Sequence, residues 1–399
     1  MARVAGRWTR SARRVLPQMR AWRIAFHEDP ELSNEETHTR NRVVAALRTL
    51  SLKPTTYDDG FNGVLAIIAG GRPGPVVALR ADMDALPVTE ETGLAFRSRN
   101  PGRMHACGHD VHMSALLGAG AVLAAHRAEL RGTVKLLFQP AEEEGEEGGA
   151  RPFLERGCFE RPRVDYVVGQ HVDPSVPLGS IGTRVGPAMA AADRFRIRIR
   201  GHGGHAAAPH LGPDAVLVAS EIVVGLQALV SRVRSPVDPV VVSVGQIHGG
   251  TRHNILPEEV VLDGTVRTFR PATRERMEVA LRRRARSIAA SLEAKVRIEY
   301  YRGYPALWNP AAATRVITEG LRAEFGPSRV IELDEPVMGA EDFARYLERV
   351  PGTFFQLGVG VPGRSAGLHS ARFAPPEAPL VHGAAALLAA TEALQRNPP

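Results

Sequence analysis

Cysteine is scarce in this chain, with two residues among 399, Cys107 and Cys158. Two cysteines cannot build the disulfide framework of a small secreted domain, which favours a reducing compartment. Apolar runs of the roughly 18 to 20 residues that span a bilayer are also lacking, so we do not expect a membrane protein. The first twenty residues contain no apolar core of the about 7 to 15 residues that a secretory signal needs. We therefore expect a cytoplasmic protein.

Lysine is nearly absent too, since the chain contains only Lys53, Lys135 and Lys295. Almost all of the basic residues behind the formal net charge of +7 are therefore arginines. Together with 39 glycines and 30 prolines, this is typical of genome-wide compositional bias. The densest basic cluster, residues 282–286, lies in a helical pattern without interleaved aromatics and is interpreted as a solvated helix face. We expect no nucleic-acid partner, since such a role would rest on charge alone.

The length of 399 residues, with 44% hydrophobic and 23% charged residues, indicates a soluble globular chain of two domains. Short β-branched runs alternate with helical patterns in the first part of the chain. The expected strands cover 64–68, 76–79, 133–138 and 166–168, and the expected helices cover 37–50 and 112–128. This alternation predicts an α/β fold whose sheet is mostly parallel and covered on both sides.

From about residue 187 the pattern changes to half-exposed strands, as in 194–200, where arginine alternates with apolar residues. A β-α-β-β-α-β unit is expected, with strands at 194–200, 240–247, 258–268 and 296–300 and helices at 213–232 and 273–292. The pattern of buried strands and helices then returns, with helices at 311–325, 340–349 and 377–395 and a strand at 353–358. We therefore expect an extension over 1–20, a larger domain over 21–186 and 303–399, and an inserted α+β domain over 187–302.

Residues of metal-ligand type follow the ends of the predicted strands, where open α/β sheets build their sites. They are Asp82 and Asp84, Cys107 and His109, Glu142 to Glu144, His171 and, far downstream, His369. Taken singly, each histidine fits a structural role and the acidic run fits a solvated loop. Together, a thiolate, three imidazoles and a carboxylate are too many ligands for one tetrahedral ion with an open position. They suit two divalent ions that share ligands.

The neighbouring glutamates Glu142 and Glu143 have a chemical logic of their own. Adjacent side chains on an extended backbone point in opposite directions. One carboxylate can therefore bind metal while the other faces the water that the metal activates. The second would act as general base and then deliver the proton to the leaving nitrogen.

Seven segments of this sequence resemble, in order, the amidohydrolase branch of the aminoacylase and glutamate-carboxypeptidase metallopeptidase family. The segments are RADMDALPV, MHACGHDVH, FQPAEEEGEEGG, GGHAAAPH, NILPE, GAEDF and GLHS. The resemblance covers roughly residues 20–395, and the branch includes hippurate hydrolases, auxin–amino acid conjugate hydrolases and N-acetyldiaminopimelate deacetylases. It implies a two-metal, aminopeptidase-like α/β catalytic domain carrying an inserted α+β lid or dimerisation domain, and a homodimer formed through that lid.

The resemblance also implies roles for individual residues. The metal ligands would be Cys107, His109, Glu143, His171 and His369. Glu142 would be the catalytic acid and base, and Asp84 would orient a ligating histidine. His205 of the lid would stabilise the oxyanion of the tetrahedral intermediate, and the lid residues Asn254 and Arg267 would bind substrate. Arg267 lies in an alternating strand, where a solvated arginine is the alternative. Related branches have histidine at the position of Asp82, whose role is left open.

The expected reaction is hydrolysis of the amide bond of a small-molecule N-acyl amino acid by two divalent ions per subunit. Zinc and manganese are the first choices, with nickel and cobalt as alternatives, because the ligand types do not decide among them. A dipeptidase or exopeptidase of the same family differs by needing a free amino terminus on its substrate. A metal-retaining binding protein without catalysis is the alternative from another class, and the intact Glu142–Glu143 pair argues against it.

Overall fold

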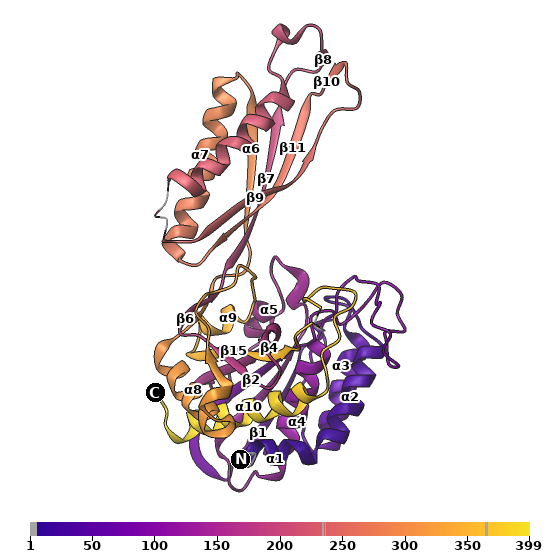
Figure 1. The fold of residues 1–399 in the computed structure, drawn as a ribbon, viewed down its shortest axis with the longest axis vertical. Helices are drawn as coiled ribbons and strands as arrows, with labels where there is room; N and C mark the ends of the chain where they lie inside the picture. Colours follow the sequence, from indigo (N-terminus) through magenta and orange to yellow (C-terminus); the bar gives the residue numbers. More distant parts are fainter. Residues whose placement is uncertain (1–5, 234, 236, 364–365) are drawn as a thin grey trace. The chain divides into compact units, whose positions relative to one another are not determined.

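The computed structural model describes residues 6–233, 235, 237–363 and 366–399 (Figure 1). The chain divides into two compact units. Unit 1 comprises Met1–Ala188, Trp308–Pro336 and Asp342–Pro399, and unit 2 comprises Met189–Leu307 and Val337–Glu341. Unit 2 is therefore an insertion in the chain of unit 1.

The central sheet of unit 1 has seven strands in the order β1-β3-β2-β4-β15-β5-β14. The strands are β1 (Val64–Ala69), β2 (Arg72–Asp82), β3 (Arg131–Gln139), β4 (Tyr166–Pro177), β5 (Ile181–Thr183), β14 (Val330–Glu332) and β15 (Gly352–Gly360). Four neighbouring pairs are parallel, while β1–β3 and β15–β5 are antiparallel. The predicted α/β class with a mostly parallel sheet is confirmed.

Helices surround this sheet, and β6 and β13 lie near the points where the chain passes between the units. The helices are α1 (Arg7–Arg14), α2 (Leu16–Glu28), α3 (Thr37–Thr49), α4 (His109–Ala125), α5 (Ala150–Glu155), α8 (Ala311–Phe325), α9 (Ala344–Leu347) and α10 (Ala378–Arg396), with the 3-10 turns η1 (Glu142–Glu144) and η3 (Pro327–Arg329). The two short strands are β6 (Gly186–Met189) and β13 (Leu307–Asn309). Helices α4 and α10 are rich in alanine and leucine, pack against each other and against β2, and are buried along most of their length.

Two expected segments differ from the structure. The expected extension over 1–20 is helical from Arg7 onward, because Trp8, Ala12 and Met19 are buried in the core of unit 1; residues 1–5 lie outside the described residues. The helix expected over 340–349 shrinks to α9. The Asp342 carboxylate accepts a hydrogen bond from the buried Arg80 guanidinium at 2.8 Å, and the helix begins only after this anchored residue.

Unit 2 contains a four-stranded antiparallel sheet in the order β12-β7-β11-β9. Its elements are β7 (Ala191–Arg200), β8 (Gly204–His205), η2 (Pro209–Leu211), α6 (Ala215–Arg232), β9 (Val240–His248), β10 (Ile255–Leu256), β11 (Glu259–Thr268), α7 (Pro271–Ser291) and β12 (Lys295–Arg302). Both helices pack on one face of the sheet (Figure 1). Phe195, Ile197 and Ile199 face those helices, whereas the arginines between them point to the other face.

The expectation that no segment has the length and apolarity of a membrane span is wrong for helix α6. Its 18 residues have a mean hydropathy of 1.6, because Ser220, Glu221 and Gln227 interrupt the apolar run without lowering the mean far. A single helix of this kind is weak support for a membrane span, since core helices of soluble proteins meet the same criterion. Val218 and Ile222 of α6 are buried in the core of unit 2.

Candidate metal centre

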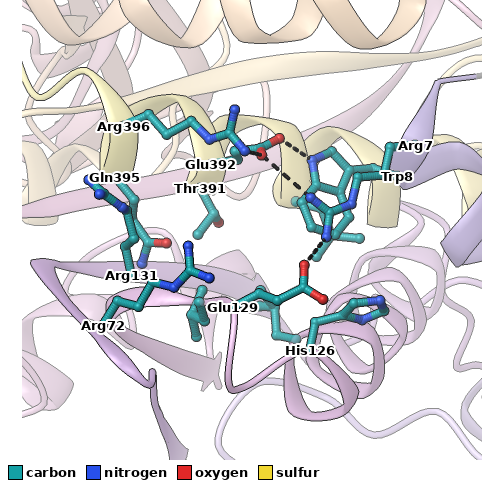
Figure 2. Close-up of a pocket in the computed structure, with 13 residues that line it drawn as sticks. Arg7, Trp8, Arg72, His126, Glu129, Arg131, Thr391, Glu392, Gln395 and Arg396 are labelled. Carbon is teal, nitrogen blue, oxygen red and sulfur yellow. Dashed lines mark hydrogen bonds and ion pairs between the residues drawn. The ribbon is translucent and has the colours of Figure 1, made fainter.

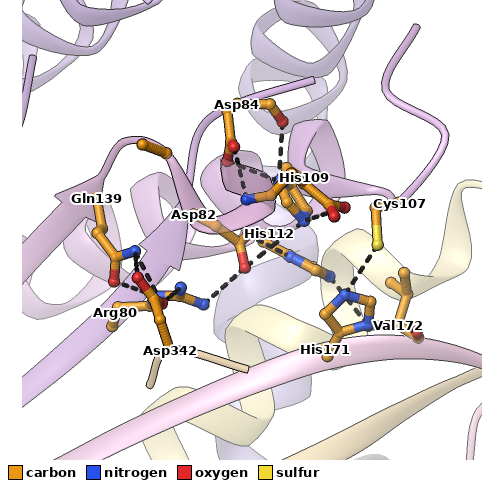
Figure 3. Close-up of polar contacts among 12 residues, drawn as sticks. Arg80, Asp82, Asp84, Cys107, His109, His112, Gln139, His171, Val172 and Asp342 are labelled. Atoms are coloured by element: carbon orange, nitrogen blue, oxygen red, sulfur yellow. Dashed lines mark hydrogen bonds and ion pairs between the residues drawn. The ribbon is translucent and has the colours of Figure 1, made fainter. Parts of the chain in front are cut away.

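Three ligand-type side chains converge where β4 passes the start of α4. Cys107 Sγ lies 3.2 Å from His171 Nε2, and the ligand atoms of Cys107, His109 and His171 all lie within 4.8 Å of one another (Figure 3). Gly108 adopts φ 81° directly before α4, a left-handed conformation that glycine accepts at little cost. This turn lets residues 107 and 109 on either side of it contribute to the same cluster.

The orientation of both histidine rings is fixed by backbone carbonyls. His109 Nδ1 lies 2.8 Å from the carbonyl oxygen of Asp84, and His171 Nδ1 lies 2.7 Å from that of Val172. A carbonyl only accepts, so each Nδ1 donates and each neutral ring presents an unprotonated Nε2. His109 Nε2 is buried and makes no hydrogen bond to any residue that the structure describes. A buried ring nitrogen without a hydrogen bond fits a metal ligand, since a bound cation would take the place of its proton.

Glu143 and His369 adjoin this cluster. His369 Nε2 lies 3.3 Å from Glu143 Oε1, which is itself 3.9 Å from His109 Nε2. The backbone N–H of His369 donates to the carbonyl of Ala106 at 2.9 Å, which ties the downstream loop to the segment of Cys107. Cys107, Glu143 and His369 form a second group whose ligand atoms lie within 4.8 Å of one another. The five predicted metal ligands are thus brought together in unit 1.

Glu142 lies in the same place but not in the expected conformation. Residues Glu142–Glu144 form the 3-10 turn η1 instead of extended chain, so the expectation of opposite-pointing neighbours is wrong. Ala141, with φ 55°, redirects the chain after β3, and its N–H donates to the Glu36 carboxylate at 2.8 Å. The carboxylates of Glu142 and Glu143 both lie within 4.8 Å of the ligand nitrogen of His109. Glu36 lies in none of the seven motif segments, so its contact with Ala141 could not be predicted from the sequence.

Asp84 anchors the turn that holds Glu143. Its Oδ2 accepts hydrogen bonds from Glu143 N at 2.8 Å and from Ser33 Oγ at 2.6 Å. Its Oδ1 lies 3.4 Å from His109 Nδ1, so the closer contact of that ring is to the Asp84 backbone carbonyl. Asp84 is therefore placed to orient both the histidine and the glutamate. Burial alone would raise the pKa of Asp84, but the contact with His109 outweighs it and lowers the pKa.

Asp82 belongs to a buried network beside the cluster rather than facing an open position. Its Oδ1 lies 2.6 Å from His112 Nδ1, and its Oδ2 accepts from Arg80 Nη1 at 2.6 Å. His112 Nε2 in turn accepts the backbone N–H of Val172 at 2.9 Å. Both carboxylate oxygens of Asp82 and both ring nitrogens of His112 are therefore already hydrogen-bonded, which argues against a metal ion ligated by these two residues.

Arg80 extends this network across the sheet. Its guanidinium also donates to Gln139 and Asp342 (Figure 3). Tyr346 donates to the same Gln139 oxygen at 3.0 Å. Arg80 is only 1% exposed, yet three charged or polar neighbours satisfy it. Arg80, Gln139 and Asp342 stand in the segments RADMDALPV, FQPAEEEGEEGG and GAEDF, whereas Tyr346 lies outside all seven segments. Nothing in the sequence pairs residues 80 and 342.

The electrostatics of the site favour a cation. Burial, followed by the neighbouring Glu143 and Glu142 carboxylates, raises the pKa of the Cys107 thiol well above its usual range. Burial would lower the pKa of His109, but Asp82 and the other nearby carboxylates outweigh it and raise that pKa to about 10. Such an excess of buried carboxylates is stable only with compensating positive charge. Divalent ions would supply that charge.

The predicted lid residues lie in unit 2. His205 is exposed on β8, and its Nδ1 accepts the Ala207 N–H at 3.0 Å, so the proton of the neutral ring sits on Nε2. Asn254 is its neighbour, because Ala206 N donates to the Asn254 carbonyl at 3.0 Å. Arg267 is not part of this pair. It pairs with Ala192 near the far end of β11, roughly 26 Å along the strand from Glu259 at about 3.3 Å per residue.

Residues 78–393 match the model of peptidase family M20/M25/M40. The chain belongs to this family. The M20 chain is 41% identical over 336 residues to the N-acetyl-L-cysteine deacetylase of Bacillus subtilis (strain 168), covering 84% of this chain and 78% of that protein. It is 40% identical over 338 residues to thermostable carboxypeptidase 1 of Saccharolobus solfataricus, covering 84% of each protein. The resemblance inferred from the sequence motifs is thus confirmed at the level of the family.

A solved structure supports the same assignment. The YXEP protein of Bacillus subtilis, described as a dinuclear metal binding peptidase of the M20 family, has a TM-score of 0.83 and 33% sequence identity. The alignment covers 96% of the M20 chain and 99% of that protein. The M20 chain is therefore a hydrolase with amidohydrolases and peptidases among its relatives.

Proposed function

We propose that this protein hydrolyses the amide bond of N-acyl amino acids and releases a carboxylate and a free amino acid. The main observation is the placement of Glu142 within 4.8 Å of His109 and Glu143, next to a buried His109 Nε2 that makes no hydrogen bond to the described residues. A base beside a ligand cluster is the arrangement that metal-assisted amide hydrolysis requires. The deacetylase relative supports an N-acyl substrate.

Two divalent ions fit the donor set. Cys107, His109, His171, Glu143 and His369 would hold them, because two ions can share five protein ligands and keep open positions. When bound, such ions lower the pKa of a water ligand from 15.7 to about 7 and polarise the amide carbonyl. Zinc and manganese remain the first choices, with nickel and cobalt as alternatives.

Proton transfer and stabilisation of the oxyanion would then be carried out by different residues. Glu142 takes the proton from the attacking water and delivers it to the leaving nitrogen. His205 donates its Nε2 proton in a hydrogen bond to the oxyanion, the role that the family resemblance gives it. A His205→Ala variant should lose about 10²- to 10³-fold in kcat, as is typical for one oxyanion donor. Asn254 and Arg267 would both bind substrate. Because about 26 Å of strand β11 separates Arg267 from the end near Asn254, the two residues at one site would come from different subunits of the dimer.

A Glu142→Gln variant tests the assigned base. It should retain bound metal, measured by elemental analysis, and lose turnover by about 10²- to 10⁴-fold. Glu147→Gln is the matched control, because Glu147 lies five residues on and is exposed. Near-normal hydrolysis by pure, metal-loaded Glu142→Gln protein would refute the role of Glu142.

Paired substrates test the reaction class. We expect hydrolysis of acetyl and benzoyl amino acids and little hydrolysis of dipeptides with a free amino terminus. The reverse preference would assign the protein as a dipeptidase or exopeptidase, an alternative that the carboxypeptidase relative supports. Metal-loaded protein inert toward both groups would point to a binding protein.

A homodimer through unit 2 and a cytoplasmic location belong to the same proposal. Val216, Leu217 and Val224 of α6 are exposed apolar residues on the surface of unit 2, which fits contact with a second copy. Sedimentation analysis of the wild type and of a Leu217→Glu/Val224→Glu variant tests this, since a dimer formed there should dissociate in the variant.

A further inference from the structure

A cavity of about 200 Å³ lies at the edge of the unit 1 sheet where β2 and β3 begin (Figure 2). Its polar lining includes Arg7, Arg72, Arg131, Gln395 and Arg396, and Trp8 forms part of its wall. The metal-ligand cluster lies beyond the other ends of the same strands. Eight residue steps along β3, at about 3.3 Å each, separate Arg131 from Gln139 by roughly 26 Å. The cavity is thus separate from the proposed catalytic site.

The two carboxylates of the cavity are already neutralised. Glu129 pairs with Arg7 at 2.6 Å, and Glu392 pairs with Arg396 at 2.7 Å and accepts a hydrogen bond from Trp8 Nε1 at 2.7 Å. Arg72 and Arg131 have no hydrogen-bond or ion-pair partner for their side chains among the described residues. They are nevertheless register partners on neighbouring strands. Two adjacent like charges are unfavourable, and an anion between them would relieve their repulsion.

A buried donor points to the same ligand. Gln395 is only 5% exposed, and its Nε2 is a buried donor without a hydrogen-bond partner in the part of the chain that the structure describes. Figure 2 shows Gln395, Arg131 and Arg72 along one side of the cavity, across from Arg7 and Trp8. The Gln395 N–H and the Arg72 and Arg131 guanidinium groups are all hydrogen-bond donors, and no described residue accepts from them. An acceptor oxygen is what this set lacks.

The rest of the lining is apolar, with leucines at positions 123, 130 and 388. We propose that this cavity is a binding site for a small organic carboxylate. Arg72, Arg131 and Gln395 hold the carboxylate oxygens, and the apolar body of the ligand rests on the leucines and Trp8. The carboxylate that the proposed reaction releases belongs to the same chemical class.

Tryptophan fluorescence of the metal-loaded protein tests this proposal, with cyclohexanecarboxylate as the probe because it does not absorb near 295 nm. We expect a saturable change in emission that disappears in a Trp8→Phe variant. In an Arg72→Gln/Arg131→Gln variant the apparent Kd should rise by about tenfold or more, since two charge-assisted hydrogen bonds are lost. The matched control is Arg40→Gln/Arg48→Gln, which removes the same charge from α3 and should bind like the wild type.

A Gln395→Met variant separates binding from structure. It should weaken binding while the melting temperature stays equal or rises, because a buried donor without a partner is removed. Equal affinity in the wild type and the Arg72→Gln/Arg131→Gln variant would overturn the proposal, as would the absence of a saturable change in the wild type. Inorganic phosphate binding as tightly as the probe would overturn the role of the apolar body. Amide hydrolysis by the arginine variant should remain at the wild-type rate.

Discussion

His112 donates its Nδ1 proton to Asp82 Oδ1 across 2.6 Å, and the other side of the ring fixes the direction of this hydrogen bond. His112 Nε2 accepts the backbone N–H of Val172, so the proton of the neutral ring must sit on Nδ1. Burial, as the largest cause, lowers the pKa of His112 to about 4 and keeps the ring neutral at pH 7. Asp82 thereby links β2 to the strand that carries His171, and its position supports the ligand cluster without offering it a ligand.

An Asp82→Asn substitution should destabilise the protein strongly. The substitution replaces one carboxylate oxygen with an NH2 donor, so either Arg80 or His112 would face a donor instead of an acceptor. It also removes the negative charge, so the buried Arg80 guanidinium keeps only Asp342 as a carboxylate partner. Breaking a buried ion pair in this way costs about 3–5 kcal/mol. Urea denaturation at pH 7 should show the loss. Asp59→Asn is the control, because Asp59 pairs with Arg156 at the surface. Equal midpoints for the two variants would contradict the structural role of Asp82.

A Cys107→Ser substitution should reduce metal binding while leaving the fold intact. Loss of partners outside the ligand set already weakens metal affinity by about 10- to 100-fold, so loss of a thiolate ligand should weaken it at least as much. The measurement is metal content after dialysis against a graded series of chelator concentrations. Cys158→Ser is a matched control, since Cys158 is also buried but is not part of any described ligand group. Retention of both ions by Cys107→Ser would remove Cys107 from the ligand set.

The strand ends and their ligand-type residues could be predicted from sequence, because hydrophobic runs and the polar residues after them are local patterns. The expected strand at 133–138, for example, appears as β3, and Glu142 follows its end. The turn η1 could not be predicted. It depends on a left-handed Ala141 held by Glu36, a contact across 105 residues of chain. The bond between Arg80 and Asp342 spans 262 residues and is equally invisible to local patterns.

Arg267 offers a test of substrate binding that distinguishes it from a solvated arginine. Its guanidinium is half-buried, burial lowers its pKa, and it has no hydrogen-bond or ion-pair partner among the described residues. If Arg267 binds the α-carboxylate, Arg267→Met should raise KM by about tenfold or more for N-acyl amino acids, with kcat little changed. Substrates with an amidated carboxyl group should be unaffected.

The control for this prediction is Arg198→Met on the neighbouring strand β7, where a half-exposed arginine lies near Glu259. It should change neither KM nor kcat. An Arg267→Met variant that treats carboxylate and amide substrates alike would assign Arg267 to the solvated face instead.

His27 should make stability depend on pH above neutrality. Its Nδ1 lies 3.0 Å from Asp110 and its Nε2 lies 3.2 Å from Glu90, so the imidazolium satisfies both carboxylates. Burial opposes the charged ring, but these two carboxylates outweigh it and raise the pKa of His27 to about 9. Arg23 also pairs with Asp110, and the ring of His105 lies nearby.

A folded-state pKa above the unfolded value near 6.5 means that the native state binds the proton more tightly. The stabilisation is therefore complete below about pH 6.5 and is lost as the pH rises through about 9, amounting to about 3 kcal/mol. Urea denaturation of the wild type and of His27→Gln from pH 6 to pH 10 should give curves that converge with rising pH. The exposed His38→Gln variant should run parallel to the wild type. Parallel curves for His27→Gln as well would mean that His27 is not the group that binds the extra proton in the native state.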